Sequence, residues 1–226
     1  MKPQTVSHDL SNLCTALKDA NTFYGISTDC TVFDAARSSL QRHGFIGRSV
    51  ERSRRLEPNE FELISNELET VNANAKNYIP LQDIMTVAIE LGLRLGEISK
   101  LRTSDICEKT NTLTVRDRKH PNKDKRHTDL LNISEKVIET LQKQPPREDD
   151  LLFPFNTKAI GHKWRKLTKK LGINDLRFHD LRTEAACRMY EAGMAIVDIS
   201  KVTGHQDLNI LNKHYLPLCA YLPEAA

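Results

Sequence analysis

The sequence lacks the features that mark membrane-spanning, secreted and zinc-binding proteins. No apolar run approaches the ~18 residues that a transmembrane helix needs. The segment Met1–Ala20 is mixed and polar, without the apolar core of a signal peptide. The five cysteines are scattered without a CxxC pair, which argues against both a zinc site and a disulfide framework. We therefore expect reduced thiols and a cytoplasmic protein.

A strong excess of one charge is also missing. The 226 residues include 33 lysines and arginines and 30 acidic residues, which gives a formal net charge of +3. So small an excess does not indicate nucleic-acid binding by itself, and only local basic clusters can carry that argument. No internal repeat or low-complexity tract is present. The length suits one large domain, or one domain with a small companion.

Two regions of different character follow one another along the chain. Residues 1–55 are expected to form two short helices, Leu10–Ala20 and Thr31–Arg42, followed by a basic linker. The arginines of this linker are Arg48, Arg52, Arg54 and Arg55. Two interpretations of them stay open, a solvated loop or a direct phosphate contact. Residues 56–226 have denser apolar periodicity and are expected to form the second domain.

Apolar spacing predicts a mainly helical second domain with a small antiparallel sheet, an α+β fold. Alternation over Leu113–Arg118 and His127–Leu131 predicts a β-hairpin. Asn132 is expected to cap the next helix, which ends near Lys143. Further helices are expected to begin near Glu57 and to span Pro80–Leu91, Glu97–Leu101, Thr157–Leu171, Asp180–Glu191, Val197–Val202 and Asp207–Leu216.

The first candidate phosphate ligand lies in Gly92-Leu93-Arg94-Leu95-Gly96-Glu97. Arg94 follows a glycine break and precedes a short helix, and Glu97 lies one turn later, where it can hold the guanidinium. The planar guanidinium suits phosphate because it donates two parallel hydrogen bonds. Taken alone, this pattern fits an ordinary surface Arg–Glu pair better than a binding site.

A very basic loop joins the two expected strands. Its sequence is Lys119-His120-Pro121-Asn122-Lys123-Asp124-Lys125-Arg126. A lysine at a hairpin tip can lie beside a DNA backbone and give a proton to a leaving oxygen. Lys119, Lys123 and Lys125 compete for that role. The alternative is non-specific attraction of phosphate by a solvated loop.

The third candidate group is His179-Asp180-Leu181-Arg182, followed by Gly204-His205 and then Tyr215. His179 and Arg182 are three residues apart and share one face of a helix. A cation, proton carriers and a phenol nucleophile are the groups needed to break a phosphodiester without a metal. A lone His–Arg pair on a helix is usually structural, so the ordered set carries the argument. If these groups meet in space, the protein cuts and rejoins DNA.

In this order the motifs resemble those of the catalytic domain of tyrosine recombinases, the phage integrase family. The resemblance runs from about Arg54 to Leu218. The matching segments are Gly92–Ile98 (first arginine motif), Arg118–Pro121 (β-hairpin lysine), His179–Arg182 (H-x-x-R box) and Thr203–His205 (LGH-type loop). The resemblance implies the DNA breaking-rejoining fold and site-specific recombination or integration of double-stranded DNA.

The resemblance also implies a role for each residue. Arg94 and Arg182 would clamp the scissile phosphate and stabilise its transition state. Lys119 would be the general acid toward the leaving 5′-oxygen, His179 would assist proton removal from the nucleophile, and His205 would hydrogen-bond the phosphate. A tyrosine would form a 3′-phosphotyrosyl link, which conserves the bond energy for rejoining. No metal, cofactor, small-molecule substrate or membrane is implied.

The nucleophile departs from the family pattern. Family members place their tyrosine at the position of His214, and Tyr215 comes one residue later. One residue turns a helical side chain by roughly 100 degrees. Either Gln206–Asn212 absorbs the extra residue or the chain has lost normal cleavage. We favour Tyr215 over Tyr221, because nearby prolines disfavour a regular helix around Tyr221.

The regions at the two ends also depart from the family pattern. Relatives usually carry a larger helical DNA clamp before the catalytic domain, so DNA binding is expected to be weak and salt-sensitive. Family members assemble as tetramers on DNA, and we expect a monomer in free solution. Three functions therefore compete. They are a recombinase acting through Tyr215, a catalytically inactive DNA-binding or regulatory protein on the same scaffold, and, last, a type IB topoisomerase.

Overall fold

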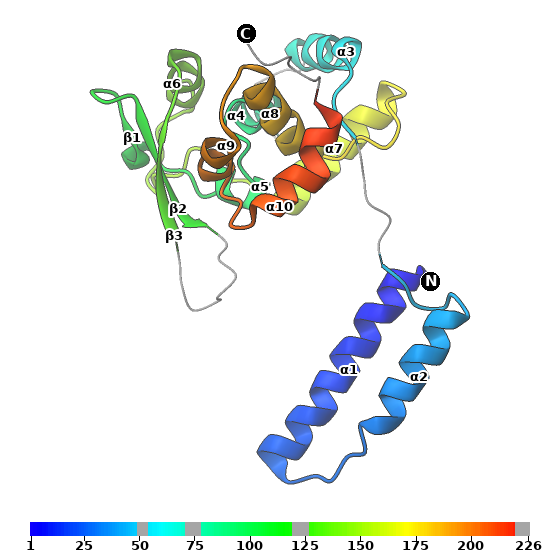
Figure 1. The fold of residues 1–226 in the computed structure, drawn as a ribbon. Helices are drawn as coiled ribbons and strands as arrows, with labels where there is room; N and C mark the ends of the chain where they lie inside the picture. The colour runs from blue at the N-terminus through cyan, green and yellow to red at the C-terminus, as the bar shows by residue number, and fades with distance from the viewer. Residues whose placement is uncertain (49–53, 71–77, 119–126, 220–226) are drawn as a thin grey trace. The chain divides into compact units, whose positions relative to one another are not determined.

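The computed structural model describes residues 1–48, 54–70, 78–118 and 127–219, and only the backbone of residues 214–216. The chain divides into two compact units, Met1–Arg52 and Ser53–Ala226 (Figure 1). The competing lysines Lys119, Lys123 and Lys125, and also Tyr221, lie outside the described residues. Within the described ranges, no helix is both long and apolar enough to cross a membrane.

The first unit is a pair of helices, α1 (Pro3–Tyr24) and α2 (Thr31–Arg42). The bounds of α2 are those expected. The helix expected over Leu10–Ala20 is present, but its predicted bounds were too short, because α1 extends beyond them at both ends. Pro3 suits the first helical turn, where its missing N–H costs nothing. Gly25 ends α1 in the left-handed conformation, at φ 65°.

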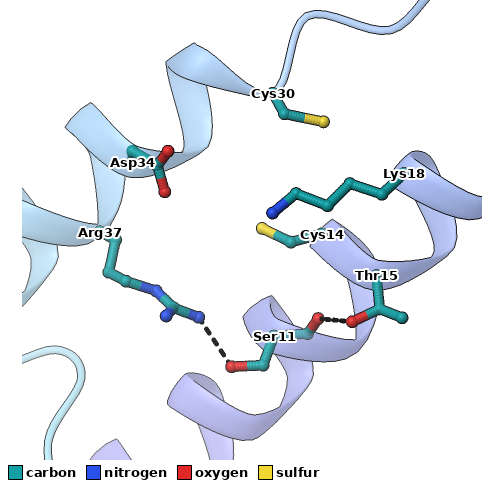
Figure 2. Close-up of a pocket in the computed structure, with 7 residues that line it drawn as sticks. All are labelled: Ser11, Cys14, Thr15, Lys18, Cys30, Asp34 and Arg37. Atoms are coloured by element: carbon teal, nitrogen blue, oxygen red, sulfur yellow. Dashed lines mark hydrogen bonds between the residues drawn. The ribbon is translucent and has the colours of Figure 1, made fainter.

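Polar side chains line the space between α1 and α2 (Figure 2). Arg37 on α2 donates a 2.7 Å hydrogen bond to the Ser11 hydroxyl on α1. Cys14, Lys18 and Cys30 also face this cavity of about 200 Å³. Neither helix has a buried residue. Polar contacts therefore join this pair more than an apolar core does.

The second unit is a helical body with a small sheet at one side (Figure 1). Its helices are α3 (Pro58–Glu69), α4 (Leu81–Leu91), α5 (Leu95–Ile98), α6 (Glu135–Gln142), α7 (Thr157–Lys170), α8 (Asp180–Glu191), α9 (Ile196–Thr203) and α10 (Leu208–Ile210). The central helix is α4, seven of whose eleven residues are buried. It packs against α3, α6 and α8. This core fixes the start of α8, where the H-x-x-R box lies.

The sheet is antiparallel with strand order β1-β2-β3. Its strands are β1 (Ile106–Cys107), β2 (Thr112–Arg118) and β3 (His127–Asn132), and a 3₁₀ turn, η1 (Thr103–Asp105), precedes β1. The predicted β2–β3 hairpin is confirmed, whereas β1 was not expected. The capping prediction was wrong, because Asn132 pairs with Thr112 in the sheet and Ser134 is the N-cap of α6.

A bulge near the end of β2 reverses the direction of one side chain. The pairing is regular from Thr112 to Val115 and then shifts before Arg118 pairs with His127. Asp117, inside the shift, has the left-handed φ of 54°. Strict alternation with the buried Val115 would turn Arg118 to solvent. The bulge instead turns Arg118 inward, where it is 2% exposed.

The segment after α9 is not the continuous helix expected over Asp207–Leu216. It consists of α10, a π-helical turn η2 (Leu211–Tyr215) and a 3₁₀ turn η3 (Leu216–Leu218). A π-helical turn closes with i→i+5 hydrogen bonds and so holds about one residue more than an α-helical turn. The backbone therefore takes up an additional residue just before Tyr215.

Candidate active site at the carboxyl end of α9

Three arginines from different elements converge on the carboxyl end of α9. The acceptors are the successive carbonyls of Lys201, Val202, Thr203 and Gly204. Arg118 donates to the first two, at 3.1 and 2.9 Å, Arg182 to the third, and Arg94 to the fourth at 3.4 Å. The last carbonyls of a helix lack intrahelical partners and carry partial negative charge. They are therefore natural acceptors for guanidinium groups.

Arg94 is held by a buried carboxylate but stays open to solvent. It is the N-cap of α5, and Glu97 accepts from its backbone N–H at 2.9 Å and from its Nη1 at 2.7 Å. Glu97 is 6% exposed, so this is not an ordinary surface pair. The Arg94 side chain keeps 29% of its surface exposed. It can therefore meet an anion from solvent without losing its support.

Arg182 on α8 ties three parts of the second unit together. Its Nη1 donates to the Gly92 carbonyl at 2.7 Å and to the Thr203 carbonyl, and its Nη2 lies 3.0 Å from His205 Nε2. Gly92 ends α4 at φ 59°, and a Cβ there would lie 2.9 Å from the Thr203 methyl group. Only glycine combines that conformation with so close an approach. Arg182 itself is 2% exposed.

The partners of His205 fix its tautomer. Arginine only donates, so Nε2 must accept from Arg182. The proton therefore lies on Nδ1, which donates to the Thr203 hydroxyl at 2.7 Å, and that hydroxyl donates to the Ile199 carbonyl at 2.7 Å. Burial, followed by repulsion from Arg182 and Arg94, lowers the pKa of His205 to about 3. The ring is neutral in the free protein.

His179 lies immediately before α8 and is exposed as a residue. The protein atoms around its ring penalise the charged form, and the charges of Arg182 and Arg94 add to that penalty. These effects outweigh the neighbouring Asp180 carboxylate and lower the pKa of His179. A neutral imidazole that solvent can reach is suited to accept a proton.

Arg118 belongs to this candidate site, and reasoning from sequence missed it. It pairs with Asp129 at 2.7 Å and with Glu97, the support of Arg94, at 3.6 Å. Gly204 leaves room for it, because a Cβ there would lie 2.6 Å from the Arg118 Cζ. Arg118 therefore links the hairpin to both Arg94 and the His205 loop. The single hint in the sequence is Asp117, since aspartate tolerates the left-handed conformation that the bulge requires.

The structure brings four of the six sequence-predicted site residues together. They are Arg94, His179, Arg182 and His205. Lys119 follows Arg118 directly but lies outside the described residues. Tyr215 is the last residue of η2, and its side chain is outside the described part of the chain. Cations and neutral imidazoles around one point suit a bound phosphodiester.

A comparison with known protein families assigns the second unit to one of them. The family model described as "Phage integrase family" matches residues 54–219, which is more than half of the chain. This chain belongs to the phage integrase family. Members of this family are tyrosine-type site-specific DNA recombinases. The family is associated with DNA recombination, DNA integration and DNA binding. The mainly helical fold with its small antiparallel sheet is the fold of integrase catalytic domains.

Curated relatives match about three quarters of this chain, and the chain matches only part of each relative. The shufflon-specific DNA recombinase of Escherichia coli is 29% identical over 72% of this chain and 40% of its own length. The integrase of Salmonella phage P22 is 25% identical, over 72% of this chain and 43% of its own. The chain thus spans less than half the length of these two relatives.

Solved structures support the fold. The Tn1549 transposon integrase in complex with circular intermediate DNA has a TM-score of 0.66 at 17% identity, covering 99% of this chain and 77% of that one. The catalytic domain of bacteriophage HP1 integrase has a TM-score of 0.55 at 16% identity, covering 74% of this chain and 89% of that one.

Proposed function

We propose that this chain is a tyrosine-type site-specific recombinase that cuts and rejoins double-stranded DNA through Tyr215. The observation that carries the proposal is the convergence of Arg94, Arg182, His179 and His205 on the carboxyl end of α9. A relative, the Tn1549 integrase, is solved in complex with DNA, which supports DNA as the partner. The fixed cations stabilise the negative charge on the phosphoryl oxygens in the transition state.

Phosphate enters this site by competing for arginine donors. Of the three converging arginines Arg94 is the one that solvent reaches, and a phosphate oxygen is a stronger acceptor than the Gly204 carbonyl that it binds at 3.4 Å. His205 Nε2 accepts from Arg182 in the free protein, so it needs a proton to donate to phosphate. A shift of the ring proton from Nδ1 to Nε2 supplies that donor without a change in charge, because the Thr203 hydroxyl then donates to Nδ1 instead of accepting from it.

The chemical step transfers phosphorus between two oxygens. The Tyr215 hydroxyl oxygen forms a bond to phosphorus while the bond from phosphorus to the 5′-oxygen breaks. Neutral His179 takes the phenol proton, and Lys119 gives a proton to the leaving 5′-oxygen. The reverse step rejoins the strand without ATP. The π-helical turn Leu211–Tyr215 supports Tyr215 as nucleophile, because it takes up the one residue by which this chain exceeds the family spacing.

Covalent capture tests the proposal. The purified chain is incubated with a pool of nicked duplexes whose central positions are randomised, and DNA that stays attached after denaturation is sequenced. We expect an adduct that mass spectrometry maps to Tyr215. Tyr215→Phe should abolish it, whereas the matched change Tyr221→Phe should leave it intact. An adduct on Tyr221, or an undiminished adduct in Tyr215→Phe, would contradict the assignment.

One alternative has its own support. His214 occupies the usual tyrosine position, and two carbonyls already bind the Nη1 of Arg182. Both facts favour a catalytically inactive DNA-binding or regulatory protein on the same scaffold. Salt-sensitive binding to the same duplex pool without any covalent product would identify that function. Relaxation of supercoiled plasmid without sequence preference would instead indicate a topoisomerase.

A further inference from the structure

Arg55 binds the segment that follows Tyr215 and also binds α8. Its Nε donates to Glu184 at 3.0 Å and its Nη2 to Glu191 at 3.1 Å, and Nη1 contacts Glu191 as well. The same Nη1 donates to the Leu218 carbonyl at 3.2 Å. The sequence suggested a solvated linker or a phosphate contact for this arginine. The structure instead engages its guanidinium in bonds within the second unit.

The two carboxylates explain why an arginine holds this position. Glu184 and Glu191 are seven residues apart on α8, about two helical turns, so they share one face. Glu184 is buried and also accepts from Arg188 at 2.7 Å. A buried carboxylate is strongly destabilising without its partner, which fixes the guanidinium in place. The planar fork of arginine bridges two carboxylates and a carbonyl, and the single ammonium of lysine does not.

A second contact holds the same segment to the same helix. Cys219, directly after Leu218, is hydrogen-bonded through its thiol to Cys187, which is buried on α8. Burial raises the pKa of both thiols, so both remain protonated. Leu218 and Cys219 lie three and four residues after Tyr215. The backbone just beyond the nucleophile is thus fastened to the helix that carries Arg182.

We propose that Arg55 is a positioning residue for the nucleophile. It fastens the segment carrying Tyr215 to α8 and so sets the place of that segment relative to Arg182, which lies on the same helix. Arg55 touches no reacting atom in this scheme. Misplacement of a reacting group by about 1 Å can cost about 100-fold in rate. The proposal rests on the proposed function only for the role of Tyr215, and the anchor itself is testable without activity.

Hydrogen exchange in the DNA-free full-length chain tests the anchor. We expect Arg55→Gln to speed amide exchange in residues 208–219 while exchange in α4 stays at the wild-type level. Arg188→Gln is the matched control, because it removes an arginine from the same Glu184 carboxylate without touching Leu218. It should leave exchange in residues 208–219 unchanged. Equal exchange in this segment for Arg55→Gln and wild type would overturn the proposal.

The covalent assay tests the consequence for the reaction. Under single-turnover conditions, adduct formation by Arg55→Gln should fall about 10–100-fold at unchanged DNA affinity. Arg55→Lys keeps the positive charge but not the planar guanidinium, so its rate of adduct formation should fall less. This variant also provides the test if Arg55→Gln does not fold. A wild-type adduct rate in both variants would remove the positioning role and leave the proposed function standing. Absence of an adduct in the wild type would refute the proposed function, while the exchange result would still decide the anchor.

Discussion

His205 is the residue at which the balance of charge in the site is most easily measured. Its pKa lies near 3 in the folded protein, against 6.5 as the ordinary value. Between these two values the unfolded chain binds a proton at this histidine that the native ring does not. The contribution of His205 to the free energy of unfolding is therefore complete above pH 6.5 and is lost as the pH falls toward the folded pKa.

We expect His205→Gln to weaken this acid destabilisation, because glutamine keeps an acceptor for Arg182 but does not titrate. The free energy of unfolding in urea is measured across this pH range for both proteins. At about pH 4.5, the wild type should have lost up to about 3 kcal/mol more than the variant. His162→Gln, at an exposed histidine on α7, should follow the wild type. A difference between His205→Gln and wild type that does not vary with pH would contradict this account.

Side-chain contacts between residues close in the sequence were predictable, and those that depend on a bulge or on distant residues were not. The Arg94–Glu97 pair was predictable, because both residues lie at a helix start where local geometry decides. The inward direction of Arg118 was not, because it depends on a bulge at Asp117 that alternation cannot reveal. The contacts of Arg55 with Glu184 and Leu218 were also beyond reach, because they join residues far apart in the chain.

At the scale of elements, the carboxyl end of α9 positions the arginines of the site, and Gly204 is the residue there that Arg118 approaches most closely. Gly204 has φ 71°, and a Cβ would meet the Arg118 guanidinium at 2.6–2.7 Å. Gly172, after α7, has the same φ of 71° but open space around it. Substituting alanine at Gly172 and at Gly204 therefore separates two free-energy costs, that of the left-handed backbone conformation and that of the contact with Arg118.

We expect Gly172→Ala to cost about 1 kcal/mol, from the left-handed conformation alone. Gly204→Ala should cost about 1–3 kcal/mol more, because the added methyl group displaces a buried arginine from its carbonyl and carboxylate partners. Urea denaturation of the two variants measures both values. Equal costs would mean that Arg118 moves aside freely and does not hold the end of α9.

Elements with strong local signals were predictable and those set by tertiary contacts were not. The bounds of α2 and α8 are as expected, because their ends are marked by charged and apolar spacing. The short strand β1 exists only through its pairing with β2, which no local pattern announces. The π-helical turn η2 was likewise hidden within an apparently continuous helix. This turn matters most for Tyr215, because Tyr215 is its last residue.

At the scale of the whole molecule, positive charge is concentrated in one short segment and not in either unit as a whole. Residues 1–52 contain six lysines and arginines and five acidic residues, so this unit is nearly neutral. The loop of residues 119–126 contains four lysines and arginines and one aspartate. DNA affinity depends on salt through the phosphates that cations neutralise. The loop should therefore supply more of that dependence than the first unit does.

We expect the double variant Lys123→Gln, Lys125→Gln to lower the slope of log affinity against log salt concentration by about 2, because each lost phosphate contact removes about 0.9. Fluorescence anisotropy with a labelled duplex gives the slope. Lys18→Gln with Arg42→Gln removes the same charge from exposed positions of the first unit, and should leave the slope within about 1 of the wild type. A larger loss in this control would mean that the helix pair α1–α2 contacts the DNA backbone. Both units would then contribute to the salt dependence of DNA binding, even though the first has almost no net charge.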